Sequence, residues 1–437
     1  MTVELPGVAT ERTTAELLDS RDSLGSFRSE FFHADPHQCY LDGNSLGKLP
    51  LATRDSVASF VTHEWGTELV EGWGHWIDEA QVAGDLLASA TLGTGPGQTL
   101  VCDTTSMNFY QLAIAAIRSR PGRKTVIIDS ANFPTDRYIL EGIAADLGLS
   151  LLTLDTDGQG GPGAVSVSVE HERVTAEALS PYLSDDVALV TLQAINYRSG
   201  ARSEIAEIQA AVTAAGAHML WDCSHAGGAI DLDFDGNKIN LAVGCTYKYG
   251  NSGPGSPAWL FVRSELQQEL QVPIKGWFAQ EDQFIMGPWF EKARGIRGFQ
   301  VASPSIVGIR GVQASYEMIQ RAGIAEIEKK AALGTELMIQ LVDAWLVPHG
   351  FTLGTPREAS HRGGHIIIRH PEAATIALAL RQLVNVVPDY RSPDAIRLAI
   401  SPLPTSYVEV WDGFDRLRGV MESGAYREVA PQETRVT

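Results

Sequence analysis

The chain has 437 residues, of which 44% are hydrophobic and 20% are charged, and its formal net charge is −19. That length allows two or three domains around a large core, and the composition is ordinary for a globular protein. The negative charge argues against nucleic acid or an anionic membrane as a partner, and no apolar run approaches a membrane span. Four scattered cysteines without a CxxC pair, and an N-terminus without an apolar segment, lead us to expect a cytoplasmic protein.

The first 38 residues are expected to form a helical arm. Thr13–Glu16 is a plausible capped start, and Phe27, Phe31 and Phe32 offer an apolar stripe. Such an arm can wrap around a partner or pack on its own domain, and the sequence favours neither arrangement over the other.

A short strand with a polar turn follows at Tyr40–Gly47, which is rich in residues that tolerate tight conformations. The segment 51–92 is predicted to be mostly helical. It is interrupted by Gly72–Trp76, whose aromatic cluster suits a ligand lid and an ordinary core equally well.

A strand end runs into hydroxyl side chains at Leu100–Ser106, and Met107–Arg120 has helical periodicity. Hydroxyl groups and free amides at a helix N-terminus can bind an anion. The alternative is a plain helix cap, because many helices begin in this way.

From residue 124 to 262 the pattern alternates strands and helices, which predicts a mainly parallel sheet covered by helices. Ligands of such sheets bind beyond the carboxyl ends of the strands. Polar residues gather at those predicted ends. They are Phe133–Asp136, Asn196–Gly200, Asp222–His225 and Tyr247–Lys248.

Lys248 lies between two tyrosines, after an apolar run and before a loop of small residues that ends at Gly255. A lysine at the end of a buried strand is unusual, because burial disfavours its charge; one use for it is to form a Schiff base. The alternative is a surface lysine in a β-turn. Asp222, about two dozen residues earlier, suits the partner of a pyridine nitrogen. Together the two residues favour a pyridoxal phosphate site.

The C-terminal part is predicted to form a small α+β domain. Two long helices, Pro304–Ala322 and Ile324–Leu346, precede strands that include His365–Arg369 and Ala395–Ile400. The expected organisation is thus an arm over 1–38, a large α/β domain over 39–310 and the small domain over 311–437, without a metal site. The last 14 residues, 424–437, are expected to fray.

Five motifs between residues 41 and 255 resemble kynureninase, within a match that runs in order from about residue 40 to 406. The resemblance implies a fold-type I pyridoxal 5′-phosphate enzyme, with a small-molecule amino-acid substrate and a homodimer with shared active sites. The motifs are Leu41–Gly47, Phe133–Asp136, Tyr197–Gly200, Trp221–Gly228 and Tyr247–Gly255.

The resemblance also implies roles for individual residues. Lys248 would be the Schiff-base lysine and Tyr247 a proton relay that touches the phosphate, while Arg397 would bind the substrate carboxylate with its forked guanidinium. Asn44, Ser45, Gln280 and Trp73 would lie on the substrate side. The remaining cofactor contacts would come from Thr105, Ser106, Phe133, Asp136, Asp222, His225, Trp277 and Ser303.

The substrate half of the resemblance is weaker than the cofactor half. Kynureninases usually have Gly-Trp-x-Gly-His where this chain has Gly276–Gln280, and Asn-Pro-Pro or Thr-Pro-Pro where it has Ala302–Ser305. The first expectation is therefore hydrolysis of the Cβ–Cγ bond of kynurenine or 3-hydroxykynurenine. The alternative is a natural-product enzyme of the same fold, which would process another amino acid such as an S-cysteinyl conjugate by β-elimination or decarboxylation.

Overall fold

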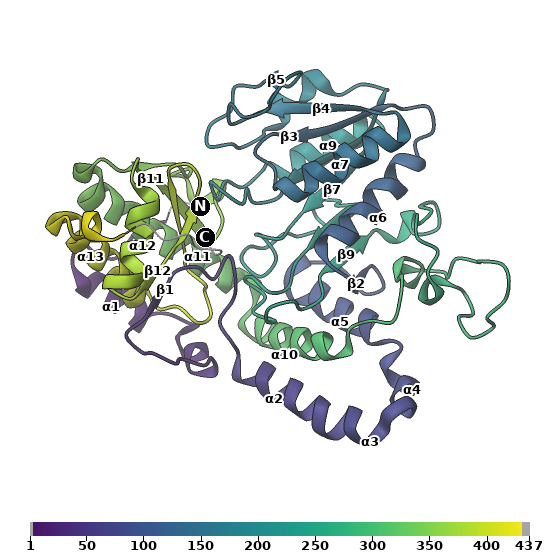
Figure 1. The fold of residues 1–437 in the computed structure, drawn as a ribbon, viewed down its shortest axis with the longest axis horizontal. Helices are drawn as coiled ribbons and strands as arrows, with labels where there is room; N and C mark the ends of the chain where they lie inside the picture. Colours follow the sequence, from purple (N-terminus) through teal and green to yellow (C-terminus); the bar gives the residue numbers. More distant parts are fainter. Residues whose placement is uncertain (1–2, 431–437) are drawn as a thin grey trace.

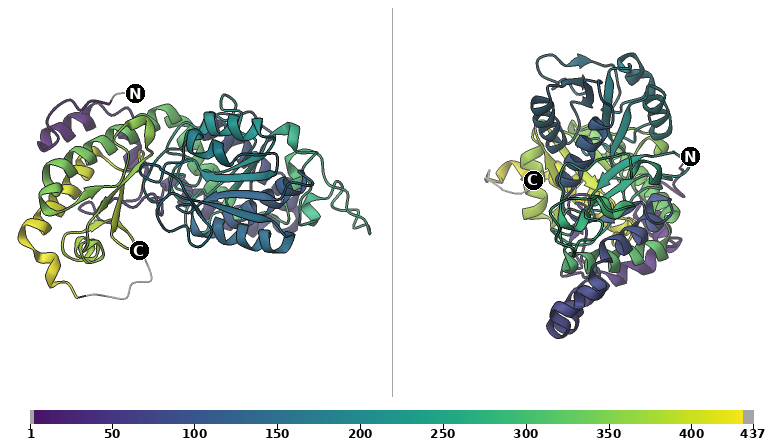
Figure 2. Two further views of the ribbon diagram at one scale, coloured as in Figure 1. Left: turned by 90° about the horizontal axis from the view of Figure 1, so that it is seen from above. Right: turned by 90° about the vertical axis from the view of Figure 1, so that its right-hand side faces the viewer.

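The computed structural model describes residues 3–430, which form a large and a small domain side by side (Figure 1 and Figure 2). Each domain has its own hydrophobic core. The core of the large domain contains residues from Leu24 to Ile327 together with Leu403. The core of the small domain joins residues 337–429 to Ala9, Ala15, Leu18, Cys39 and Leu41.

An eight-stranded sheet organises the large domain, in the order β2-β9-β8-β7-β6-β3-β4-β5. The run from β8 to β5 is parallel, and β9 is antiparallel to both of its neighbours. This arrangement confirms the predicted mainly parallel sheet. The strands are β2 (Thr99–Val101), β3 (Thr125–Asp129), β4 (Ser150–Asp155), β5 (Val165–Ser166), β6 (Val187–Gln193), β7 (His218–Asp222), β8 (Leu241–Gly244) and β9 (Trp259–Val262).

Helices cover the sheet on both sides (Figure 2). The central strands are consequently buried along their whole length, and all seven residues of β6 are buried. The helices of this domain are α2 (Leu51–Ser59), α3 (Gly66–Glu68), α4 (Trp73–Trp76), α5 (Glu79–Leu87), α6 (Thr105–Arg118), α7 (Pro134–Leu147), α8 (Ala176–Leu179), α9 (Ile205–Ala214) and α10 (Ile306–Ala322).

The small domain contains a four-stranded antiparallel sheet in the order β10-β11-β14-β13. Beside it, β1 (Cys39–Tyr40) pairs with β12 (Val386–Val387). The strands of the sheet are β10 (Thr352–Leu353), β11 (His365–Arg369), β13 (Asp389–Arg391) and β14 (Ala395–Ala399). Its helices are α11 (Ile324–Leu341), α12 (Ala373–Leu383) and α13 (Tyr407–Ser423).

The first part of the N-terminal arm lies on the small domain of its own chain, whereas Leu24 and Phe31 in its second part belong to the large-domain core. Its helix α1 (Arg12–Ser20) contributes Ala15 and Leu18 to the small-domain core. The carboxylate of Asp19 accepts hydrogen bonds from the first amides of α13, Tyr407 and Val408, at 2.8 and 3.1 Å. The arm therefore supplies a cap for α13, because the first amides of a helix have no partner within it.

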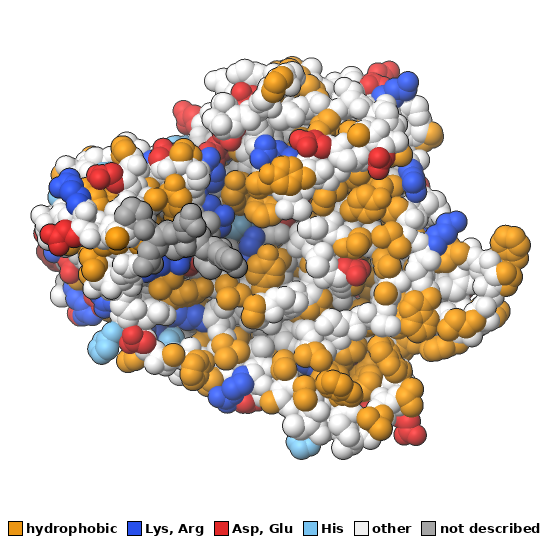
Figure 3. Space-filling view, viewed as in Figure 1, with side chains coloured by type: hydrophobic (Ala, Val, Ile, Leu, Met, Phe, Trp, Pro, Cys, Tyr) orange, Lys and Arg blue, Asp and Glu red, His pale blue; other side chains and the backbone are white. Residues whose placement is uncertain are grey.

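A long connection, residues 268–300 between β9 and α10, extends away from the body of the large domain (right of Figure 1). It exposes large apolar side chains, and Trp289 is 84% exposed. Hydrophobic side chains also gather beside this segment in the space-filling view (Figure 3). Among the described residues, no helix combines the length and apolar character that a membrane crossing needs.

Candidate active site

The carboxyl ends of β6, β7 and β8 meet at one edge of the sheet, where Gln193 lies opposite Asp222 and Asp222 opposite Val243. A cavity of about 260 Å³ opens there. It is lined by residues that leave β2, β3, β6, β7 and β8, so five separate loops converge on it. They are Thr104, Thr105, Ser106, Phe133, Thr135, Asp136, Tyr197, Asp222, Ser224, His225, Tyr247, Lys248, Gly255, Ser256 and Ala258.

The amine of Lys248 lies in this cavity, 2.9 Å from Nε2 of His225. It also lies 5.9 Å from the ring centres of both Phe133 and Tyr247. Burial lowers the pKa of Lys248 below its usual value, because the charged form loses its water. Burial likewise lowers the pKa of His225 well below its usual value. The amine of Lys248 therefore lies beside a neutral imidazole, that of His225.

Two carboxylates lie in the floor of the cavity. Asp222 is 5% exposed, and its Oδ1 accepts a hydrogen bond from the amide of Ser224 at 2.9 Å. Asp136 is also buried, and its pKa is raised well above the usual range by burial and then by the charge of Asp222. Asp136 consequently favours the protonated state, which can donate a hydrogen bond.

The helix α6 begins at the cavity and directs its first turn towards it. Thr104 caps this helix by accepting a hydrogen bond from the amide of Met107 at 3.3 Å. The side chains of Thr105 and Ser106 line the cavity, and the first amides of a helix have no partner within it. Hydroxyl groups and amides at the positive end of a helix dipole suit a phosphate.

Aromatic side chains form one wall of the cavity. The rings of Phe133 and Tyr197 meet edge to face, with centres 5.4 Å apart. Phe133 is 36% exposed and therefore offers a free face to a planar ligand. Tyr247 has a pKa raised above its usual value by its proximity to Cys245 and by burial, so its hydroxyl keeps its proton.

Arg397 comes from the small domain and is 1% exposed. Its guanidinium contacts Asp389 at 2.6 Å and donates to Oγ of Ser45 at 2.9 Å and to the carbonyl oxygen of Tyr197. The side-chain oxygen of Asn44, in the orientation that satisfies both groups, accepts from Nε at 2.5 Å. Tyr197, whose carbonyl accepts from Arg397, lines the Lys248 cavity, so Arg397 lies beside that cavity.

A phosphorylated pyridine fits this set of residues. Two buried polar atoms that line the cavity, Oδ2 of Asp136 and Nδ1 of His225, have no hydrogen-bond partner among residues 3–430. The cavity also joins a carboxylate, an aromatic face, a helix N-terminus and a buried amine. These four features match a ring nitrogen, a ring face, a phosphate and an aldehyde respectively.

Seven of the residues expected at the site do not line this cavity: Asn44, Ser45 and Arg397 contact one another beside it, and the other four lie apart from both groups within the single chain. Trp73 packs against Trp76 and Phe278, with ring centres 5.7 and 6.1 Å apart. Trp277 and Gln280 lie in the projecting segment 268–300, and Ser303 follows it. The other predicted residues line the cavity or contact Arg397.

Reasoning from the sequence alone missed two buried residues beside Arg397 and His225. Asp389 is 0% exposed and lies directly opposite Arg397 on the neighbouring strand. His365 is also 0% exposed, and its ring centre lies 5.4 Å from that of His225. Charged residues alternate along Asp389–Arg391, which begins eight residues before Arg397. Alternate residues of a strand lie on one face, so this pattern could have predicted a charged strand face that pairs with the strand of Arg397.

Comparisons with known proteins agree with this geometry. A family model described as the kynureninase C-terminal domain matches residues 327–417. The kynureninase of Pseudomonas fluorescens is 33% identical over 422 residues, which cover 94% of this chain and 96% of that protein. The kynureninase of Burkholderia pseudomallei (strain 1106a) is 32% identical over 423 residues, covering 95% and 97%.

Solved structures share the fold at lower identity. A C-DES mutant with glycine covalently linked to its PLP cofactor superposes with a TM-score of 0.74 at 16% identity, covering 88% of this chain and 97% of that one. The cysteine desulfurase of Thermococcus onnurineus NA1 gives a TM-score of 0.74 at 16% identity, covering 92% and 98%. The chain therefore belongs to the kynureninase family, whose members are pyridoxal 5′-phosphate-dependent enzymes.

Proposed function

We propose that this enzyme uses pyridoxal 5′-phosphate to hydrolyse the Cβ–Cγ bond of L-kynurenine or 3-hydroxykynurenine, releasing alanine and an anthranilate. The observation that carries the proposal is that Lys248 and Asp222 line one cavity, while Arg397 of the small domain donates to the carbonyl of Tyr197, a residue that lines the same cavity. The relatives at 32–33% identity, all named kynureninase, favour this reaction over the S-cysteinyl alternative.

When bound, the cofactor supplies an aldehyde that captures the substrate amine and a ring that takes up the electron pair released at Cα. Asp222 would keep a proton on the ring nitrogen, which makes the ring a better acceptor. Thr105 and Ser106, with the amides of α6, would hold the phosphate. Phe133 would lie against the ring face, and Asp136 and His225 would bind the remaining polar groups.

Lys248 would first hold the cofactor and then act as a base. Because burial lowers its pKa, its amine loses a proton more readily than that of an exposed lysine and can take the proton from Cα. Nε2 of His225, at 2.9 Å, would orient the amine during this transfer. Tyr247 keeps its proton and would deliver it near Cβ when the Cβ–Cγ bond breaks.

Arg397 would bind the α-carboxylate of the substrate. Asn44 and Ser45 hold the guanidinium from one side, and Asp389 holds it from the other. Arg397 is almost fully buried, and its ion pair with Asp389 would be shared with the substrate carboxylate.

The active enzyme is further proposed to be a homodimer with shared sites. A second cavity, of about 680 Å³, is largely apolar, and Gly255 and Ser256 line both it and the Lys248 cavity. The projecting segment exposes Trp277, which would reach the cofactor phosphate of a neighbouring copy. Gln280, Ser303 and Trp73 would then face the aryl end of the substrate across the same interface.

We also propose a cytoplasmic location. All four cysteines of the chain are buried and unpaired, as is usual where thiols stay reduced.

The test is turnover of purified, cofactor-saturated enzyme. L-Kynurenine and 3-hydroxykynurenine are offered beside S-aryl cysteine conjugates, and anthranilates and pyruvate are measured separately. Release of an anthranilate with an equal amount of alanine supports the proposal. Pyruvate from the conjugates, with neither kynurenine turned over, would reject it. Sedimentation of the holoenzyme, with Trp277→Ala as the variant, tests the dimer.

A further inference from the structure

The loop 196–202 lies between the two domains and is anchored in the large one. It follows β6, and the side chain of Asn196 fixes its turn. Oδ1 of Asn196 accepts from the amides of Arg198 and Ser199 at 2.9 and 3.0 Å, while Nδ2 donates to the carbonyl of Ala131 at 3.2 Å. The loop therefore moves with the sheet that carries Lys248.

The same loop is bonded to the small domain at successive residues. Its backbone contacts involve Tyr197, Ser199, Gly200, Ala201 and Arg202. The carbonyl of Tyr197 accepts a hydrogen bond from Arg397, and the carbonyl of Ser199 accepts one from Oγ1 of Thr355 at 2.6 Å. The carbonyl of Gly200 accepts from the amide of Gly363 at 2.9 Å, and Ala201 forms an isolated β-bridge with Arg362. The amide of Arg202 donates to the carbonyl of His361 at 2.8 Å.

Gly200 shows how closely the domains approach. Its φ is +73°, and a Cβ atom there would lie 2.4 Å from the carbonyl oxygen of His365. Any side chain at this position would therefore push the small domain away from the loop.

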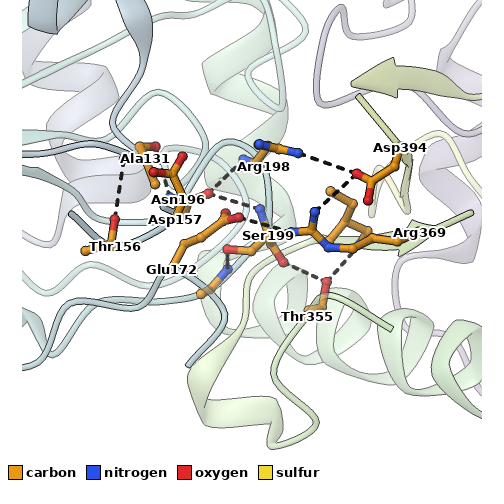
Figure 4. Close-up of polar contacts among 12 residues, drawn as sticks. Ala131, Thr156, Asp157, Glu172, Asn196, Arg198, Ser199, Thr355, Arg369 and Asp394 are labelled. Carbon is orange, nitrogen blue, oxygen red and sulfur yellow. Dashed lines mark hydrogen bonds and ion pairs between the residues drawn. The ribbon is translucent and has the colours of Figure 1, made fainter. Parts of the chain in front are cut away.

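Four charged side chains join the domains around this loop (Figure 4). Arg198 and Glu172 belong to the large domain, and Asp394 and Arg369 belong to the small domain. Asp394 contacts Arg198 at 3.8 Å and Arg369 at 3.3 Å, and Arg369 contacts Glu172 at 3.1 Å. Figure 4 shows both arginines pointing towards Asp394, so positive and negative groups alternate across the domain boundary. We call these four residues the interdomain clamp.

The clamp is linked to the active site through neighbours in the chain. Arg198 follows Tyr197, whose ring lines the Lys248 cavity and whose carbonyl accepts from Arg397. Asp394 precedes β14, the strand that carries Arg397. A shift of the clamp would therefore move Arg397 relative to Lys248, and small displacements of a substrate-binding group reduce catalytic efficiency strongly.

The clamp is suited to setting a position more than to adding net stability. The side chains of Asp394 and Arg369 are 38% and 32% exposed, whereas those of Arg198 and Glu172 are 12% and 6% exposed. Exposed ion pairs contribute little, and removal of water from a buried carboxylate opposes the attraction. Burial accordingly raises the pKa of Glu172 in spite of its two arginine neighbours.

We propose that Arg198, Asp394, Arg369 and Glu172 are positioning residues that hold the small domain against the loop 196–202 and so place Arg397 for the substrate carboxylate. The inference rests on the proposed function in one respect, the role of Arg397.

The test compares Asp394→Asn with Asp343→Asn in the holoenzyme. The control removes the exposed pair of Asp343 with Arg357, which lies within the small domain. We expect Asp394→Asn to raise KM for kynurenine about two- to fivefold, as loss of a modest ion pair would, and to leave kcat within about twofold. Binding of the corresponding amine without a carboxylate should not change, because that ligand does not use Arg397. The control should match the wild type.

Hydrogen exchange gives a readout that does not depend on turnover. Amides of residues 199–202 and 361–364 should exchange faster in Asp394→Asn and at the wild-type rate in Asp343→Asn. Unchanged exchange in Asp394→Asn, or equal weakening of the amine and of kynurenine, would overturn the clamp. If the wild type does not turn over kynurenine, the proposed function fails while the exchange result still decides the clamp.

Three further variants guard against a simple folding defect. Arg198→Gln removes the same cross-domain pair from the other side, so its effect on exchange should match that of Asp394→Asn. The double variant should be no worse than Asp394→Asn alone, whereas additive effects would reject a shared contact. Asp394→Glu keeps the charge and should restore most of the wild-type KM.

Discussion

The amine of Lys248 and Nε2 of His225 lie 2.9 Å apart in a pocket where burial lowers the pKa of both groups. The residues follow different strands, β7 and β8, and parallel pairing of these strands brings them to the same edge. The contact therefore places a lysine with a lowered pKa beside a neutral imidazole without the need for a carboxylate partner.

Replacement of the lysine tests the centre of the site. Lys248→Ala should reduce kcat at least about a thousandfold, since both the covalent anchor and the base are lost. The visible absorption of the bound cofactor should change to that of the free aldehyde. The exposed Lys329 provides the control, because Lys329→Ala should keep both activity and spectrum. A coloured, active Lys248→Ala enzyme would contradict the assignment.

Asp222→Asn keeps the shape of the side chain but removes its charge. The hydrogen bond from the amide of Ser224 can persist, since an amide oxygen also accepts. We expect kcat to fall by about a hundredfold or more, because a ring nitrogen without a proton accepts electrons poorly. Single-turnover kinetics should locate the loss in removal of the Cα proton. Asp222→Glu should recover part of the rate, and full activity of Asp222→Asn would refute the pairing.

Arg397→Gln should act on substrate binding. Loss of a buried charge that faces a carboxylate should raise KM by about a hundredfold. The variant also leaves the buried Asp389 without its 2.6 Å partner, so some loss of stability is expected. A thermal melt separates that loss from binding. If KM rose equally for kynurenine and for its amine analogue, Arg397 would not be the carboxylate site.

Asp129 predicts a pH dependence of stability. Burial raises its pKa to about 7 from an ordinary value of 3.8. As the pH falls through about 7, the folded state takes up a proton, whereas the unfolded chain does so only near 3.8. The stability contributed by this group is therefore complete below 3.8 and is lost as the pH rises through about 7.

Asp129→Asn should remove this dependence and stabilise the protein above pH 7 by roughly 2 to 4 kcal/mol. The amide can still accept the hydrogen bond from Nδ2 of Asn132. Urea unfolding at pH 5 and pH 8 measures the difference, with Asp146→Asn on the exposed side of α7 as the control. Equal pH slopes in Asp129→Asn and the wild type would exclude a raised pKa.

The sequence by itself determined the elements and the cofactor half of the site. Strands that are buried on both faces, such as β6, need a layer of helices on each side, so the alternation of strands and helices implied a parallel sheet. Parallel strands bring their carboxyl ends to one edge, and for this reason the sequence alone groups Asp222, His225 and Lys248.

Only the tertiary structure decided which distant segments meet. Arg397 contacts Asn44, Ser45 and the carbonyl of Tyr197, residues more than 190 positions away in the chain. Local periodicity carries no information about such contacts, because they arise from packing one domain on another. The pairing of Arg198 with Asp394 belongs to the same class. The sequence supplied the chemical groups of the site, and the domain arrangement set the distances between them.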